Sequence, residues 1–236
     1  MARQARQRKA HPEPELYVVP DRPVSSPPPP LKPLNAAQGR LLSSLRANTL
    51  TIAVGSAGVG KTYVTLAHAA ELLRQNKISH LILTRPLVGT EAEERIIGAL
   101  PNDLQAKLAP WVMPMMDILE ERLGRSFCQY LVKVDRIRVA PLAYMRGSSY
   151  KDTFIVMTEA QNSTPAQMKM LLTRVGEGAT LVVDGDPRQS DLDINNGLED
   201  ALRRLDDMAG VGIVRFTRAD VVRSGFCQAV LERYDE

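Results

Sequence analysis

Eight residues in the first third of the chain have the composition of a phosphate-binding loop. The stretch GSAGVGKT, residues 55–62, fits the pattern G-x-x-x-x-G-K-[ST], follows the apolar run TLTIAV and precedes an amphipathic segment. Glycines let the backbone aim successive N–H groups at phosphate oxygens, and a following helix adds partial positive charge. We expect Lys61 to reach the β- and γ-phosphates and the Thr62 hydroxyl to bind Mg²⁺. The alternative is a glycine-rich turn without a ligand. The residues expected to contact nucleotide here are Gly55, Ser56, Ala57, Gly58, Val59, Gly60, Lys61, Thr62 and Tyr63.

Carboxylates follow two other apolar runs of the chain. FIVM precedes Thr158 and Glu159, and LVV precedes Asp184 and Asp186. Because ligands bind at the carboxyl ends of parallel strands, we expect all four residues near the phosphates. Glu159 is the candidate for orienting or deprotonating the attacking water. The alternative for Glu159 is an ordinary acid at the end of a strand.

The chain from residue 34 onward alternates apolar strands with amphipathic helices. We expect strands in 49–54, 81–86, 136–142, 153–160, 180–186 and 211–216. We expect helices in 35–48, 63–75, 164–175, 197–209 and 220–234. Such alternation predicts parallel pairing with right-handed crossovers. The expected fold is therefore one doubly wound α/β domain with a mainly parallel sheet of about six strands.

Two segments depart from this pattern. Residues 1–33 are basic and then proline-rich, so we expect an extended tail that is either solvated or a basic arm touching nucleic acid or a partner subunit. The domain itself would span 34–236. Residues 96–123 are predicted to be helical in two pieces, because Pro101, Pro110 and Pro114 interrupt them.

Five blocks make the chain resemble the PhoH-like family of ATPases, relatives of the motor core of superfamily-one helicases. They are GSAGVGKTYVTLA, the run from LTRPLVGTEAEE to PMMDIL, the run from APLAYMRG to LLTRVG, VVDGDPRQSDL and DVVRSGF. The resemblance implies a single RecA-like P-loop NTPase domain, ATP as the ligand, ATP hydrolysis and a role in RNA metabolism.

The resemblance also assigns roles to residues outside the loop. Gln38 matches a glutamine that reads adenine, and Glu159 matches the glutamate that polarises the attacking water. Gln161 and Gln189 match polar residues that sense the γ-phosphate. Arg85 lies in the block that contacts nucleic acid in helicases.

The chain departs from the family at two strand ends. The family has DEAQN where this chain has TEAQN at 158–162, and Val-Thr-Gly-Asp where this chain has Val-Asp-Gly-Asp at 183–186. These strands are normally neighbours, about 4.8 Å apart. We therefore predict that Asp184 takes over the Mg²⁺ role that position 158 usually has. The alternative is that Thr158 marks a weakened or inactive ATPase and that Asp184 is incidental.

Hydrolysis would also benefit from an arginine that stabilises transition-state charge. One RecA-like domain does not supply it, so we expect a neighbouring subunit to do so in a closed ring, a homo-oligomer that would be a hexamer. The first candidates are Arg174 and Arg223, and Arg146 is the next candidate. For each, the alternative is a salt bridge to a surface acid.

Composition bounds the remaining possibilities. The net charge of +3 neither proves nor excludes a nucleic-acid partner, and no apolar run is long enough to span a membrane. Cys128 and Cys227 lack a partner motif, so we expect reduced thiols in a cytoplasmic protein. The favoured function is a Mg²⁺-dependent ATPase coupled to RNA or single-stranded nucleic acid. Its rivals are a nucleotide-binding switch without useful turnover and an oligomeric scaffold held together by ATP.

Overall fold

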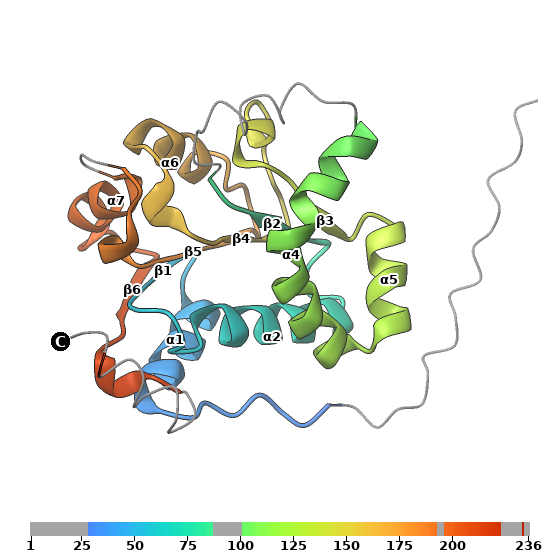
Figure 1. Ribbon diagram of the computed structural model, residues 1–236, viewed down its shortest axis with the longest axis horizontal. Helices are drawn as coiled ribbons and strands as arrows, with labels where there is room; N and C mark the ends of the chain where they lie inside the picture. Colours follow the sequence, from blue (N-terminus) through green and yellow to red (C-terminus); the bar gives the residue numbers. More distant parts are fainter. Residues whose placement is uncertain (1–27, 87–100, 193–195, 223–232, 234–236) are drawn as a thin grey trace, which may run out of the picture.

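The computed structural model describes residues 28–86, 101–192, 196–222 and 233, and of residues 101–110 only the path of the chain. Six strands form one sheet in the order β3-β2-β4-β5-β1-β6, and every pair of neighbours is parallel (Figure 1). The α/β fold with about six parallel strands is therefore confirmed. The strands are β1 (Leu50–Val54), β2 (His80–Thr84), β3 (Ile137–Val139), β4 (Thr153–Met157), β5 (Thr180–Gly185) and β6 (Val211–Arg215).

Helices cover both faces of the sheet, as the buried apolar strands require. One core packs helices α1, α2, α4 and α5 against the sheet, and a second core packs α6 and α7 against the opposite face (Figure 1). The helices are α1 (Ala36–Ala47), α2 (Lys61–Arg74), α4 (Pro101–Leu123), α5 (Arg125–Lys133), α6 (Pro165–Leu172) and α7 (Gly197–Leu205). In the described part of the chain, none of these helices is long and apolar enough to cross a bilayer.

The register between β4 and β5 places the two exchanged positions side by side. Met157 pairs with Val183, so the next residues along the chain, Thr158 and Asp184, lie next to each other at the carboxyl end of the sheet. Val182 packs in the core on the α2 side and Val183 in the opposite core. Because side chains alternate along a strand, Asp184 points to the α2 side. The prediction that these two strands are neighbours is confirmed, and β5 also lies beside the phosphate-loop strand β1.

The prediction of two helical pieces in residues 96–123 was wrong for the part that the structure describes. One helix, α4, runs from Pro101 to Leu123 through Pro110 and Pro114. Proline at the first position of a helix loses no hydrogen bond, whereas an interior proline removes one. Burial of Met115 and Leu119 in the core that contains α2 offsets this loss.

Several predicted segments lie at the edges of the described residues. Residues 28–33 have no regular structure, and Leu31 packs against the core. Residues 1–27 lie outside the described residues, so the predicted tail stays a prediction. The predicted C-terminal helix does not begin at Asp220, which ends the short 3-10 turn Arg218–Asp220 and is followed by an extended Val221; residues 223–232 lie outside the described residues.

Candidate phosphate-binding site

The phosphate loop connects β1 to α2 in a conformation that depends on glycine. Gly58 and Gly60 have φ of 82° and 86°, in the left-handed region where a side chain is strained. Helix α2 begins directly afterwards at Lys61, so its free backbone N–H groups face the loop. The Lys61 ammonium donates hydrogen bonds to the carbonyls of Gly55 at 2.6 Å and Ser56 at 3.0 Å. The lysine side chain is thus buried against its own loop, and Lys61 lines the cavity beside that loop.

The Thr62 hydroxyl donates a hydrogen bond of 2.9 Å to Oδ2 of Asp184. Asp184 is only 4% exposed. Burial raises the pKa of its carboxyl to about 6, while the Lys61 charge and the hydrogen bonds from Thr62 and the Glu159 backbone N–H oppose this rise. The carboxyl therefore lies between the first turn of α2 and the end of β4, and it binds a proton more tightly than an ordinary aspartate does.

Thr158 occupies a different position from Asp184. Its side chain is buried, and its backbone N–H donates to the Thr84 carbonyl at 3.0 Å, which extends the pairing of β4 with β2. Thr158 is not among the described residues that line the cavity beside the phosphate loop, whereas Asp184 is. Of the two exchanged residues, the structure brings Asp184 to the loop.

Glu159 has an unusual backbone. Its φ of 54° and ψ of 39° are left-handed, which costs a non-glycine residue of order 1 kcal/mol or more. Its carboxylate accepts a hydrogen bond of 2.7 Å from Nε2 of Gln161. The Glu159 side chain is exposed and lines the cavity. Strain of this kind clusters at functional sites, and the hydrogen bond from Gln161 orients the carboxylate.

Gln161 connects the ends of β4 and β5. Its Oε1 accepts from the Asp186 backbone N–H at 3.1 Å, and its Nε2 also reaches the Gln189 carbonyl at 3.5 Å. A Cβ on Gly185 would lie 2.6 Å from Gln161 Oε1, so glycine is needed for this close approach. Gln161 therefore positions the Glu159 carboxylate, a role that the sequence alone did not indicate.

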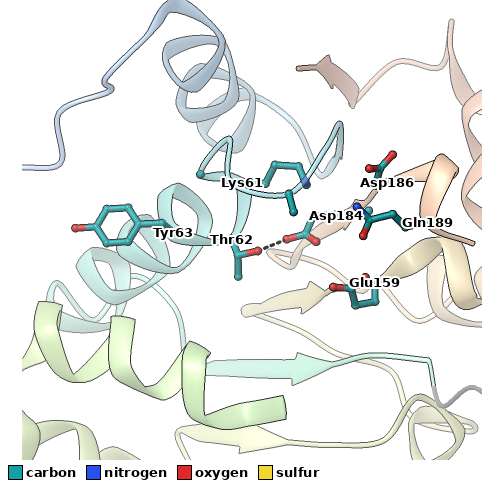
Figure 2. A pocket seen from close by; sticks show the side chains of 11 residues that line it. Lys61, Thr62, Tyr63, Glu159, Asp184, Asp186 and Gln189 are labelled. Carbon is teal, nitrogen blue, oxygen red and sulfur yellow. Dashed lines mark hydrogen bonds between the residues drawn. The ribbon is translucent and has the colours of Figure 1, made fainter. Parts of the chain in front are cut away.

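These groups surround one cavity of about 250 Å³. Figure 2 shows Thr62, Asp184 and Glu159 close together, with the Lys61 ammonium nearby. Gly185 and Asp186 line it too, and the string VDGD was the signal for them. The full lining is Ala57, Gly58, Gly60, Lys61, Thr62, Tyr63, Glu159, Asp184, Gly185, Asp186 and Gln189.

The residues fit a Mg²⁺ ion that is shared with a ligand. No group of three or more His, Cys, Asp or Glu in the described residues could hold a metal by itself. Mg²⁺ needs only one or two protein oxygens, because it keeps waters and binds phosphate oxygens. Thr62 and Asp184 present a hydroxyl and a carboxylate oxygen 2.9 Å apart at the cavity, which is such a pair.

The side chains of two predicted nucleotide contacts, Gln38 and Tyr63, bind other protein groups, although Tyr63 still lines the cavity. Gln38 is buried in α1 and is not among the described residues that line the cavity. The Tyr63 ring points away from the acidic residues in Figure 2, and its hydroxyl donates to Glu121 of α4 at 3.0 Å. Burial and the contact with Glu121 raise the pKa of the Tyr63 hydroxyl.

None of the described arginine candidates lines the cavity, and Arg223 lies outside the described residues. The Arg174 carbonyl accepts from the Tyr150 N–H, and both residues precede their strands, so Arg174 is at the amino edge of the sheet, opposite the cavity. Arg85, which the resemblance places in a block that contacts nucleic acid, follows β2, and its guanidinium lies 5.5 Å from the ring centre of Trp111. Arg146 is exposed after the short turn Leu142–Met145. Arg223 lies outside the described residues, as does Cys227, whereas Cys128 is buried with a free thiol.

A parallel sheet with a phosphate loop after β1 defines a P-loop nucleoside triphosphatase fold of the RecA-like class. The large terminase of a thermophilic bacteriophage, solved in complex with ADP, shares this fold with a TM-score of 0.52, at 15% identity over 84% of this chain and 48% of the terminase.

The PhoH-like protein family model matches residues 30–235, and the chain belongs to this family. Protein PhoH of Escherichia coli K12 is 42% identical over 87% of this chain and 58% of its own length. The PhoH-like protein of Bacillus subtilis is 39% identical over 84% of this chain and 62% of its own. The chain thus spans about three fifths of the relatives it matches.

Proposed function

We propose that this chain binds ATP together with Mg²⁺, hydrolyses the bond between the β- and γ-phosphates to release ADP and phosphate, and couples the cycle to RNA or single-stranded nucleic acid. The observation that carries the proposal is the contact of the Thr62 hydroxyl with Asp184, in the cavity that Lys61 and Glu159 also line. The terminase with this fold was solved with ADP, which supports a nucleotide as the ligand.

Each residue of the cavity has a chemical task in this proposal. The N–H groups of the loop and the first turn of α2 bind phosphate oxygens. The Lys61 ammonium, which now rests on the carbonyls of Gly55 and Ser56, neutralises charge on the β- and γ-phosphates. Thr62 and Asp184 hold Mg²⁺, which supplies further neutralisation and orients the phosphates.

Glu159 orients the attacking water in this proposal. Its carboxylate is exposed in the cavity and is held by Gln161, so it can accept a hydrogen bond from a water in line with the γ-phosphate. Because Gln161 also binds the Asp186 backbone, a shift at the end of β5 would move Glu159. In this proposal Gln161 and Gln189 sense the γ-phosphate, and the hydrogen bond from Gln161 transmits its presence to the Glu159 carboxylate.

A neighbouring subunit completes the site in this proposal. Arg174 lies at the amino edge of the sheet, so it could serve only the cavity of another copy. A ring, proposed to be a hexamer, would place this edge against the cavity of the next subunit. Arg223 is the second candidate for this role.

A nucleotide-binding switch without useful turnover is the second candidate function. Thr158 stands where the family has a metal aspartate, and the Glu159 carboxylate is already engaged by Gln161. In that case ATP would bind and alter subunit contacts without being hydrolysed.

The test of the proposed function is ATP hydrolysis by the purified full-length chain across a Mg²⁺ titration, with and without single-stranded RNA. The proposal expects phosphate release that requires Mg²⁺, is abolished in Lys61→Ala and increases with RNA. Tight ATP binding with no phosphate release at any Mg²⁺ concentration would establish the switch instead. Phosphate release at the same rate with and without RNA would contradict the coupling to RNA but still support ATP hydrolysis.

A further inference from the structure

Both polar atoms of the Gln38 side-chain amide form a hydrogen bond with a backbone group. Its Oε1 accepts from the Leu34 N–H at 2.9 Å, and its Nε2 donates to the Val59 carbonyl at 3.0 Å. Gln38 is 4% exposed, and a Cβ on Gly60 would lie only 2.6 Å from its Nε2. The amide therefore rests directly on the phosphate loop and has no open face toward a base in this structure.

A second segment holds the same loop from the C-terminal part of the chain. The Val222 N–H donates to the Gly58 carbonyl at 3.0 Å, one residue before the carbonyl that Gln38 holds. Asn35, which caps α1, donates from Nδ2 to the Asp220 carbonyl at 3.0 Å and so joins the two segments. Asp220 is in turn fixed by hydrogen bonds from Thr217. The loop thus lies in a clamp with one arm from α1 and one from 217–222.

Holding these carbonyls determines where the loop N–H groups point. A trans peptide is planar, and its C=O and N–H point in opposite directions. The Val59 carbonyl shares a peptide with the Gly60 N–H, and the Gly58 carbonyl with the Val59 N–H. With both carbonyls bound to the clamp, both N–H groups are turned away from it. Gly60 lines the cavity, so its N–H, on the peptide whose carbonyl Gln38 holds, is a group that a phosphate would use.

We propose that Gln38 is a positioning residue that fixes the phosphate loop through the Val59 carbonyl and does not read the base. This inference rests on the proposed nucleotide binding. It departs from the adenine-reading role that the resemblance implies for Gln38. In this inference, Gln38 strengthens the binding of the triphosphate group, and its contribution to the affinity is the same whichever base is attached.

The test compares three ligands on the full chain in the presence of Mg²⁺: ATP, GTP and inorganic triphosphate. Gln38→Ala removes both hydrogen bonds, and Gln38→Glu keeps the acceptor for Leu34 while placing an oxygen against the Val59 carbonyl. Gln75→Ala is the matched control, because that amide is an exposed one at the far end of α2, bonded to Glu71. Dissociation constants and melting temperatures are measured for each variant.

We expect both Gln38 variants to weaken all three ligands by the same factor, about tenfold, with the ATP-to-GTP preference unchanged. The control should bind as the wild type does. Loss of ATP binding alone would show base reading and overturn the inference. A lower melting temperature with unchanged dissociation constants would show a merely structural role and overturn it as well. A wild type that binds none of the ligands would refute the proposed function together with this inference.

Discussion

Asp184 accepts a 2.9 Å hydrogen bond from Thr62, although the two residues are separated by most of the domain in sequence. The contact is possible because β5 lies between β4 and β1, so a carboxylate on β5 stands nearer to the phosphate loop than one on β4. Thr158, directly alongside on β4, is buried and outside the cavity lining of the described residues. The resemblance to the family implies a carboxylate at the end of β4, and this chain has one at the end of the neighbouring strand β5.

Replacing Asp184 by Asn should stabilise the protein without nucleotide and abolish its Mg²⁺-dependent activity. The folded state raises the pKa of this carboxyl from 3.8 to about 6, so keeping it ionised costs about 3 kcal/mol near pH 8. An uncharged amide removes that cost and still accepts from Thr62. Denaturant unfolding near pH 8 should therefore show Asp184→Asn to be more stable by up to this amount.

The sign of this effect can be checked by lowering the pH. A carboxyl with a raised pKa binds protons more tightly when folded, so its penalty is largest above about pH 6 and shrinks as the pH falls toward 3.8. Near pH 5 the advantage of Asp184→Asn should be about half of that near pH 8. An advantage that is constant with pH, or a variant less stable at both values, would contradict the buried, ionised carboxylate.

Replacing Glu159 by Gln should slow hydrolysis and spare binding. A general base contributes about 10²- to 10⁴-fold, and the amide keeps the size of the side chain. We expect kcat to fall by at least about 100-fold with the dissociation constant for ATP nearly unchanged, measured by phosphate release and by direct binding. Equal loss of binding would show that Glu159 holds the phosphates or the loop and does not act on water.

The sequence predicted most of the residues that meet at the site, but it did not predict the hydrogen bonds that orient their side chains. Apolar runs ending in Glu159 and Asp184, with a glycine-rich loop elsewhere, are enough to place all three at one sheet edge, because parallel strands share a carboxyl end. The bridge made by Gln161 depends on Gly185 approaching it closely, and this depends on strand register. Register between β4 and β5 has no local signal in the sequence.

Helix α4 and Gln38 show the same limit. Proline predicts a break from local hydrogen bonding alone, whereas α4 continues because its packing against α2 outweighs the lost bond. Gln38 was singled out by type and position, but its partner is the Val59 carbonyl, a backbone atom that no residue pattern specifies.

The pH profile of kcat/KM for ATP should have an acid limb near pH 6. Kinetics at low substrate report the free protein, in which burial raises the pKa of Asp184 to about 6. Below that pH the carboxyl is protonated and binds a cation poorly, so kcat/KM should fall about tenfold for each further pH unit. Steady-state rates between about pH 5 and pH 8 test this, and a flat profile would exclude Asp184 as the titrating group.

Subunit mixing should reveal whether Arg174 acts on a neighbouring site. Arg174→Ala and Glu159→Gln should each be inactive alone, because each lacks one half of every site. Mixed oligomers would contain sites with Glu159 from one subunit and Arg174 from its neighbour, and activity should reappear. Light scattering in ATP and Mg²⁺ should show a homo-oligomer. A monodisperse monomer, or mixtures that stay inactive while oligomeric, would exclude Arg174 in this role.

The most direct test of Asp184 as the relocated metal carboxylate is a double-mutant cycle in Mg²⁺-dependent ATP hydrolysis. Asp184→Thr should lower kcat/KM by about 100-fold or more, as a displaced or missing ligand does. Adding Thr158→Asp to that variant should restore the rate, because it recreates the arrangement that the resemblance implies for the family. A non-additive rescue of this kind shows that the two positions share one task. Normal hydrolysis by Asp184→Thr, or an inactive wild type beside an active double variant, would contradict the account.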